Sequence, residues 1–454
     1  MKRRIPLIAC LSLSLAALHA AEPGRPLFEN SWSNPQFVSR FLGTYGFDSG
    51  LNPGISAEEK ALFEKLVPVI QSQPANAITQ LRAAIKPTSS GALDFTLGNL
   101  LFQTGNLDEA AAAYQAALQK FPTFLRAHKN IGRLYVQQGR PRDALPHLLR
   151  CIELGGGEGD IYGLVGYCYL QDNAVSSALD AYRTALLFAP KSRDWRLGKV
   201  QCLINLGQHG EAVGLLDELI SENPAEASLW LLQANAFVAN GRPADAAVNL
   251  EVVRQMGQAT PISLALLGDI YINANQPDLA VEAYSDLLKG QTTDMERALR
   301  AARILASRSA WAEAEVYLKR LQERLTDRLP PNDQFEVLGL LAKVALARGQ
   351  NDEAASLLQQ VLARDPLNGR ALLLLADYYW KKNDRERAEL HFVRAANVED
   401  VRVEALIQHA RLCVAHRDFA AASRLLNRAQ GLQPQPHVGD FLAKVEAAAR
   451  AARL

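Results

Sequence analysis

Apolar residues recur at intervals of three and four positions, the spacing of a helix that buries one face. Between Leu97 and Pro122, for example, two such stretches flank Gly105, a residue suited to a tight turn. Pro122 ends the second stretch, because proline lacks a backbone donor and clashes with the preceding helical turn. The pattern therefore predicts a unit made of a helix, a tight turn and a second helix.

This unit repeats along the chain. An alanine recurs every 34 residues, six extra residues precede Ala354, and the period then resumes. A bulky apolar residue stands four positions after each alanine. Five positions before it, Gly or Asn dominates, with Ser309 and Arg417 as exceptions. The alanines in register are Ala110, Ala144, Ala178, Ala212, Ala246, Ala280, Ala314, Ala354, Ala388 and Ala422.

From Ala92 to Pro434 these columns of small and large residues resemble the tetratricopeptide repeat (TPR) family. The resemblance implies an all-α, right-handed superhelical solenoid of tandem helix-turn-helix repeats. Val200 and Leu219 depart from the family's small residues, so their units are expected to pack more widely.

The flanking sequences complete the expected organisation. Ser56 to Glu59 forms a capping box that opens a degenerate repeat, and a helix rich in Ala, Arg and Lys ends the chain. We predict a signal peptide at 1–21, an aromatic-rich segment at 22–55, the degenerate repeat at 56–90, seven repeats over 91–325, an insertion loop at 326–334, three repeats over 335–435 and a capping helix at 436–454.

The first residues are typical of an export signal. Lys2, Arg3 and Arg4 precede an apolar stretch, and cleavage is expected near Ala20. A lipoprotein box at Cys10 would leave almost no apolar region ahead of it, so lipid anchoring is not expected. The sequence thus resembles an exported bacterial TPR protein, periplasmic or secreted, free or loosely associated with the envelope.

Charge and motif content exclude several functions. Lys and Arg (49) nearly balance Asp and Glu (48), so no basic field favours nucleic acid. Neither H-E-x-x-H nor G-x-S-x-G occurs, and the glycine-rich run at 155–159 lacks the Lys-Ser or Lys-Thr of a phosphate loop. His409 and His416 are two helical turns apart, too far to share a metal without a third element. No enzyme, cofactor or metal is predicted, and Cys151, Cys168, Cys202 and Cys413 are expected to be buried thiols.

In the TPR family the first helix of each repeat lines a concave surface, and this resemblance locates the candidate binding groove. Its apolar stripe is edged by alternating charges, which suits an extended peptide or an amphipathic helix. Burial of the same stripe between neighbouring helices is the alternative. The candidate groove residues are Phe95, Asn99, Phe102, Arg133, Tyr167, Leu170, Ile204, Asn235, Asp269, Arg303, Lys343, Asp377 and Trp380.

The sequence therefore favours an exported scaffold or adaptor that binds a protein or peptide partner. The alternative is a component of an envelope polysaccharide export or assembly system, with Tyr167, Trp195 and Trp230 stacking on sugars. A chaperone-tail clamp is not supported, because only Asn99 and Asn130 match the family's clamp positions. The aromatic segment at 22–55 either covers the first repeats or docks a partner.

Overall fold

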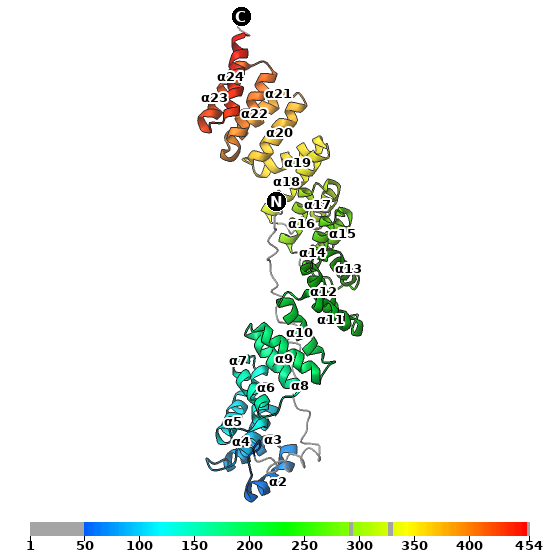
Figure 1. Cartoon of the computed structure of the whole chain (residues 1–454). Helices are drawn as coiled ribbons and strands as arrows, with labels where there is room; N and C mark the ends of the chain where they lie inside the picture. Colours follow the sequence, from blue (N-terminus) through cyan, green and yellow to red (C-terminus); the bar gives the residue numbers. More distant parts are fainter. Residues whose placement is uncertain (1–49, 290–293, 326–329, 452–454) are drawn as a thin grey trace. The chain divides into compact units, whose positions relative to one another are not determined.

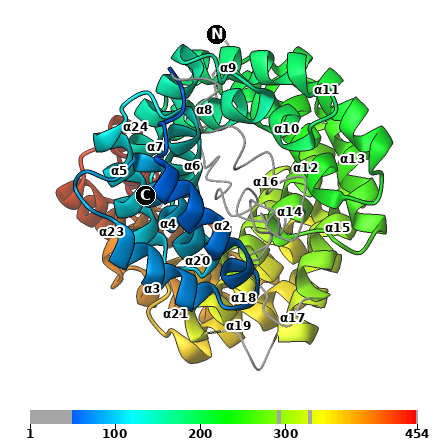
Figure 2. The same ribbon diagram turned by 90° about the horizontal axis from the view of Figure 1, so that it is seen from below.

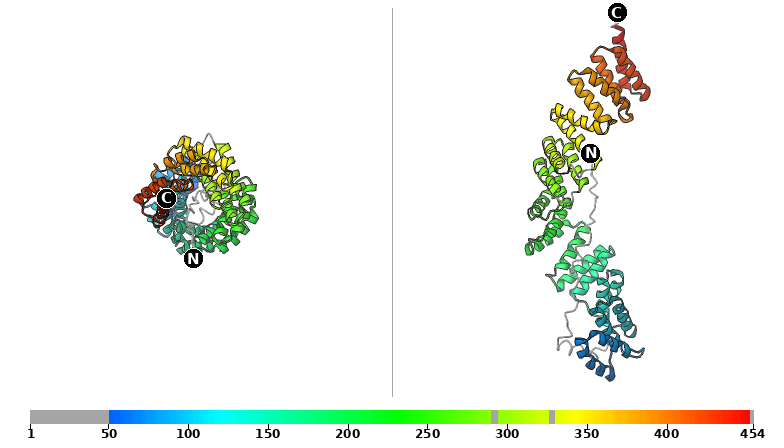
Figure 3. Two further views of the ribbon diagram at one scale, coloured as in Figure 1. Left: turned by 90° about the horizontal axis from the view of Figure 1, so that it is seen from above. Right: turned by 180° about the vertical axis from the view of Figure 1, so that it is seen from behind.

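The computed structural model describes residues 50–289, 294–325 and 330–451, and every regular element in these ranges is helical (Figure 1). The predicted signal peptide and most of the aromatic-rich segment lie outside the described residues. The chain divides into two compact units, residues 1–219 and 220–454, within α11. Within each unit the helices follow one another in chain order (Figure 2; Figure 3). This confirms the expected all-α solenoid of helix-turn-helix repeats.

The helices of the first unit form successive pairs. A first and a second helix are joined by a short turn, and the second leads into the next pair. These helices are α2 (Ala57–Ser72), α3 (Pro74–Ala84), α4 (Gly91–Gln103), α5 (Leu107–Lys120), α6 (Leu125–Gln137), α7 (Pro141–Glu153), α8 (Gly159–Gln171), α9 (Val175–Phe188), α10 (Arg193–Asn205) and α11 (His209–Glu222).

The second unit continues the same pairing and ends on a single helix. Its helices are α12 (Ala227–Ala239), α13 (Pro243–Gln255), α14 (Pro261–Asn273), α15 (Pro277–Asp286), η3 (Leu287–Lys289), α16 (Met295–Ser307), α17 (Trp311–Leu325), α18 (Pro331–Ala347), α19 (Asn351–Arg364), α20 (Gly369–Lys381), α21 (Arg385–Ala395), η4 (Glu399–Val401), α22 (Arg402–Ala415), α23 (Phe419–Leu432) and α24 (Pro436–Ala451).

The turn between paired helices is the same in each of the ten repeats from α4 to α23. At Gly105 the backbone is left-handed (φ 82°), the N–H of Gly105 donates to Phe102 and that of Asn106 donates to Leu101. These two bonds satisfy carbonyls that the helix end would otherwise leave without a partner. Ser309 and Arg417, the two exceptions in the sequence column, adopt the same turn at φ 60°.

The alanine column and the bulky column form the core. Each of the ten alanines has 0% of its surface exposed, and the bulky residues four positions later are at most 3% exposed. Glycines on several first helices admit these bulky side chains; a Cβ at Gly98 would lie 2.7 Å from the Tyr114 ring. Burying a large apolar side chain contributes about 1.5–3 kcal/mol, so the repeating core is the main source of stability.

The insertion loop predicted for residues 326–334 is wrong at its C-terminal end. Helix α18 begins at Pro331, so residues 331–334 are helical. The first residue of a helix needs no intrahelical partner for its N–H, which makes proline acceptable there. The extra length enters the helices: α17 has 15 residues and α18 has 17.

The N-terminal flank is tied to the first repeats. The capping box predicted on α2 is present, and the second oxygen of Glu59 accepts a bond from the Ser90 N–H at 2.7 Å. Leu51 accepts a backbone bond from Leu125 at the start of α6. The described end of the aromatic-rich segment therefore lies against the first unit.

Candidate functional site

Polar side chains link successive first helices of the first unit. Asn130 on α6 donates to Asn99 on α4 at 2.8 Å, and the Tyr114 hydroxyl donates to the same oxygen at 2.7 Å. Arg133 on α6 forms an ion pair with Asp160 on α8, and burial lowers the pKa of its guanidinium. The two predicted groove residues Asn99 and Arg133 therefore hold neighbouring repeats together.

The second unit uses the same arrangement. Arg300 on α16 pairs with Asp269 on α14 at 2.7 Å, and Tyr284 donates to Asp269 at 2.6 Å. Arg303 donates to Glu336 on α18 at 2.9 Å, and this pairing holds the pKa of Glu336 below its usual value. The charges of Asp269 and Arg303 are thus neutralised by first helices of adjacent repeats.

The remaining polar groove residues are not linked to a neighbouring repeat by any contact described for them. Asp377 pairs with Lys381 one turn along α20, at 2.7 Å. Asn235 is half-buried, and Lys343 on α18 is exposed. Lys343 therefore offers an exposed cation in this predicted set.

The apolar stripe is mostly half-buried: Phe102, Leu170 and Ile204 contribute only part of their surface. Phe95 does not belong to it. Its ring is 3% exposed and lies 4.7 Å from the Phe124 ring, which closes over it from the start of the next repeat. The prediction of Phe95 as a groove residue was therefore wrong, and it is a core residue.

Two half-buried aromatic residues lie on the predicted face, Tyr167 on α8 and Trp380 on α20. Each packs against the core of its own unit. Burial also raises the pKa of Tyr167, so its hydroxyl stays protonated at neutral pH. Both rings keep an accessible part that a partner could contact.

The sequence reasoning missed a second surface, on the second helices. Most of the large apolar side chains exposed among the described residues lie there. Val248 and Val316 are 62% and 42% exposed, two positions after their column alanines. That position carries polar or small residues in most repeats, so the valines at 248 and 316 could have predicted an exposed apolar surface.

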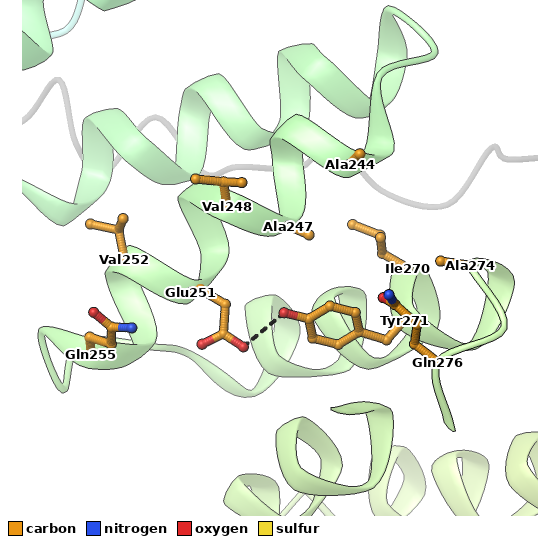
Figure 4. Close-up of a pocket in the computed structure, with 10 residues that line it drawn as sticks. All are labelled: Ala244, Ala247, Val248, Glu251, Val252, Gln255, Ile270, Tyr271, Ala274 and Gln276. Atoms are coloured by element: carbon orange, nitrogen blue, oxygen red, sulfur yellow. Dashed lines mark hydrogen bonds between the residues drawn. The ribbon is translucent and has the colours of Figure 1, made fainter. Parts of the chain in front are cut away.

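An open apolar pocket of about 500 Å³ lies between α13 and α14 (Figure 4). Val248, Val252 and Glu251 border it from α13, and Tyr271 on α14 donates to Glu251 at 3.0 Å. A shallower depression of about 430 Å³, lined by Leu279 and Val316 among others, follows between α15 and α17. We refer to the exposed second-helix side chains at these two depressions, Val248, Leu279 and Val316, as the second-helix surface.

The two tryptophans considered as sugar platforms are engaged within the protein. Trp195 packs on Gly163, where a Cβ would lie 2.3 Å from its ring. Trp230 donates its indole N–H to the Pro224 carbonyl at 2.9 Å. Both side chains are half-buried, so each offers only part of its ring to a sugar.

His128 and His147 form a largely buried pair in the first unit. The Nε2 of His128 lies 3.0 Å from the Pro122 carbonyl, which can only accept, so Nε2 carries the proton. In neutral His128 the Nδ1 is then an acceptor for His147 Nδ1, 3.0 Å away. Burial, followed by the charge of His128, lowers the pKa of His147 to about 4.

The four cysteines within the described residues are buried, as predicted. Burial raises the pKa of Cys168 to about 12 and that of Cys202 to about 11, so these thiols stay protonated. Such thiols are poor nucleophiles.

No helix within the described ranges combines the length and apolar content that crossing a bilayer requires.

Comparison with known proteins identifies the repeats. Family models described as "Tetratricopeptide repeat" match residues 169–236, 345–407 and 129–194, and one described as "TPR repeat" matches residues 98–139.

Curated relatives match only part of their own length. The general transcriptional corepressor trfA of Dictyostelium discoideum is 29% identical over 98 residues, 22% of this chain and 7% of that protein. DnaJ homolog subfamily C member 3 of Rattus norvegicus is 21% identical over 208 residues, 42% of this chain and 41% of that protein. The chain thus spans less than half the length of each of these relatives.

Solved structures give partial superpositions. YrrB, described as a TPR protein with an unusual peptide-binding site, has 19% identity and a TM-score of 0.38, covering 41% of this chain and 96% of its own. A tetratricopeptide repeat protein from Parabacteroides merdae has 22% identity and a TM-score of 0.37, covering 53% and 96%.

Proposed function

Since the chain belongs to the tetratricopeptide repeat family, we propose that it is a protein-binding scaffold. It presents the surface of its first helices to a peptide or protein partner. Stacked repeats create extended surface, which suits such a role. No catalytic activity is proposed.

The observation that carries the proposal is the composition of the first-helix surface. Partly accessible aromatics, Tyr167 on α8 and Trp380 on α20, share their helices with charges that are already paired, Asp160 with Arg133 and Asp377 with Lys381. Aromatic anchors supply much of the energy at protein interfaces, whereas paired charges add little repulsion or desolvation cost. This favours a partner that inserts an apolar side chain beside each ring.

We also propose that the protein works outside the cytoplasm, free or loosely associated with the envelope. The basic and apolar leader in residues 1–21 supports this. Intact-mass measurement of the protein recovered from the envelope fraction tests it. Loss of the mass of about the first 20 residues is expected for a cleaved signal peptide; retention of the full mass would contradict export by cleavage.

The binding surface is tested by affinity purification of the full chain from its native envelope fraction. A partner that co-elutes with the wild type should be lost from a Tyr167→Ala, Trp380→Ala variant. The matched control is Val248→Ser with Val316→Ser, which alters the second-helix surface and should keep the partner.

Each other outcome contradicts a defined part of the proposal. Loss of the partner only from the Val248 and Val316 control would place binding on the second-helix surface. Co-elution of polysaccharide without protein would replace the scaffold by the polymer-binding alternative. Circular dichroism of both variants checks that helicity is unchanged.

A further inference from the structure

Three side chains with metal-binding atoms converge between α21 and α22 of the second unit. They are Glu389, His409 and Cys413, and one ligand atom of each lies within 4.8 Å of those of the other two. His409 and Cys413 are four residues apart on α22 and therefore share a face of the helix. Glu389 faces them from α21, the second helix of the preceding repeat.

This combination of donors matches the preferences of zinc. Thiolate sulfur, imidazole nitrogen and carboxylate oxygen are its usual protein ligands, at bond lengths of about 2.0–2.3 Å. Neighbouring ligand atoms in a tetrahedral site are then roughly 3.3–3.8 Å apart. The ligand atoms therefore have to approach one another by at most about 1–1.5 Å, which small rotations of the Glu389 and His409 side chains can supply.

We propose that Glu389, His409 and Cys413 form a binding site for Zn²⁺ or a similar thiophilic divalent cation. The three side chains fill three tetrahedral positions, and the fourth is open to water or to a donor from a partner. The site links two helices of consecutive repeats, so a bound cation also stabilises their packing.

The surroundings of the cluster hold its members in place. The His409 ring stacks on Phe392 with centroids 5.8 Å apart and planes 13° apart. Arg385 donates through Nε to one oxygen of Glu389 at 2.6 Å, which orients the carboxylate and leaves its other oxygen as the ligand. Such outer contacts to ligating side chains are a regular feature of metal sites.

Zinc binds cysteine as the thiolate, so a bound cation displaces the proton of the Cys413 thiol. Proton release on metal addition is therefore expected.

The experiment titrates the full chain, first freed of metal by a chelator, with Co²⁺ and then with Zn²⁺ as competitor. One equivalent of Co²⁺ should produce a thiolate-to-cobalt charge-transfer absorption, and Zn²⁺ should displace it. Cys413→Ser should abolish the absorption. Glu389→Gln should weaken binding at least about tenfold, the effect typical of a lost ligand or supporting group.

Two matched controls separate this site from general thiol or histidine binding. Cys202→Ser removes another buried thiol, and His416→Ala removes an exposed imidazole from the end of the same helix. Both should bind Co²⁺ like the wild type.

The proposal is overturned if the wild type shows no charge-transfer absorption. It is also overturned if Glu389→Gln and Cys413→Ser bind as tightly as Cys202→Ser. Should Cys413→Ser fail to fold by circular dichroism, Glu389→Gln decides alone, because its exchange of oxygen for an amide keeps the side-chain shape.

Discussion

Gly268 on α14 lies directly against the ring of Tyr284 on α15, and replacing it by alanine tests the packing of the repeat. A Cβ at this position would lie 2.2 Å from Cε1, 2.5 Å from Cδ1 and 2.6 Å from Cζ of Tyr284. Ordinary contact begins at 3.4 Å, so the ring must retreat by about 1.2 Å (3.4 − 2.2). The ring is fully buried, and its hydroxyl donates to Asp269 at 2.6 Å.

The cost follows from these contacts. Overpacking a filled core costs about 1–3 kcal/mol. Displacing the hydroxyl from a carboxylate costs about 1.5–3 kcal/mol more. Alanine returns about 1 kcal/mol through its higher helix propensity. Gly268→Ala should therefore lower the free energy of unfolding by about 1.5–5 kcal/mol.

Gly339→Ala is the matched control in the same unit. Gly339 lies on α18, is exposed, and an added Cβ would meet no atom within 4 Å. This variant should raise the free energy of unfolding by about 0.5–1 kcal/mol, because glycine loses more backbone entropy than alanine in a helix. The same chemical change is thus expected to act with opposite signs.

Urea unfolding followed by circular dichroism measures both variants. Repeat proteins can unfold in parts, so hydrogen-exchange protection of α14 and α15 should be compared beside the unfolding midpoint. A shift of both variants in the same direction, or an unchanged midpoint for Gly268→Ala, would refute the packing argument.

Three further predictions concern charge. His147 has a pKa of about 4 in the folded chain against 6.5 ordinarily, so the unfolded chain binds more protons between these values. The full shift corresponds to about 3.4 kcal/mol, which the partial solvent exposure of the ring reduces, so stability should fall by about 1–2 kcal/mol as pH drops through that window. This loss should shrink in His147→Gln, and NMR titration showing His147 charged at pH 6 would contradict it. Glu59→Ala should cost about 1–2 kcal/mol, because one carboxylate caps both Ser56 and Ser90 backbone N–H groups; a melting temperature equal to that of the wild type would argue against this role. Asp286→Asn should cost about 1–2 kcal/mol at pH 7, since it removes the charge from the 2.6 Å pair with Arg254. Although burial alone would raise it, hydrogen bonds from Lys289 and Arg254 hold the pKa of the Asp286 carboxyl below its usual value, so the difference from wild type in urea unfolding should shrink only as the pH falls below that usual range.

Much of the fold was readable in advance because its determinants repeat locally. Each column alanine and its bulky partner lie four residues apart on one helix, so their common burial needs no knowledge of distant contacts. Gly and Asn at the turn position likewise predicted the left-handed turns, because they tolerate that backbone conformation. Ser309 and Arg417 adopt that turn although their side chains disfavour it, because the flanking helices force the geometry.

The candidate surface was harder to predict. Phe95 shares the spacing of a groove residue, but Phe124 from the next repeat covers it. The second-helix surface depends on which valines stay uncovered after neighbouring helices pack, and spacing alone does not decide that. Spacing alone likewise did not predict that α18 begins at Pro331.

The sequence by itself determined the repeat, its period and its buried columns, since these depend on residue size and on spacing within one helix pair. Tertiary structure alone decided which polar groups meet. Arg303 pairs with Glu336, 33 residues later, and Glu389 lies beside His409 and Cys413. Stacking of the repeats brings these side chains together, and the spacing of residues within one repeat does not predict such contacts. The physical reason is that helix formation depends on residues close together in the sequence, whereas ion pairing and metal ligation depend on residues close together in space.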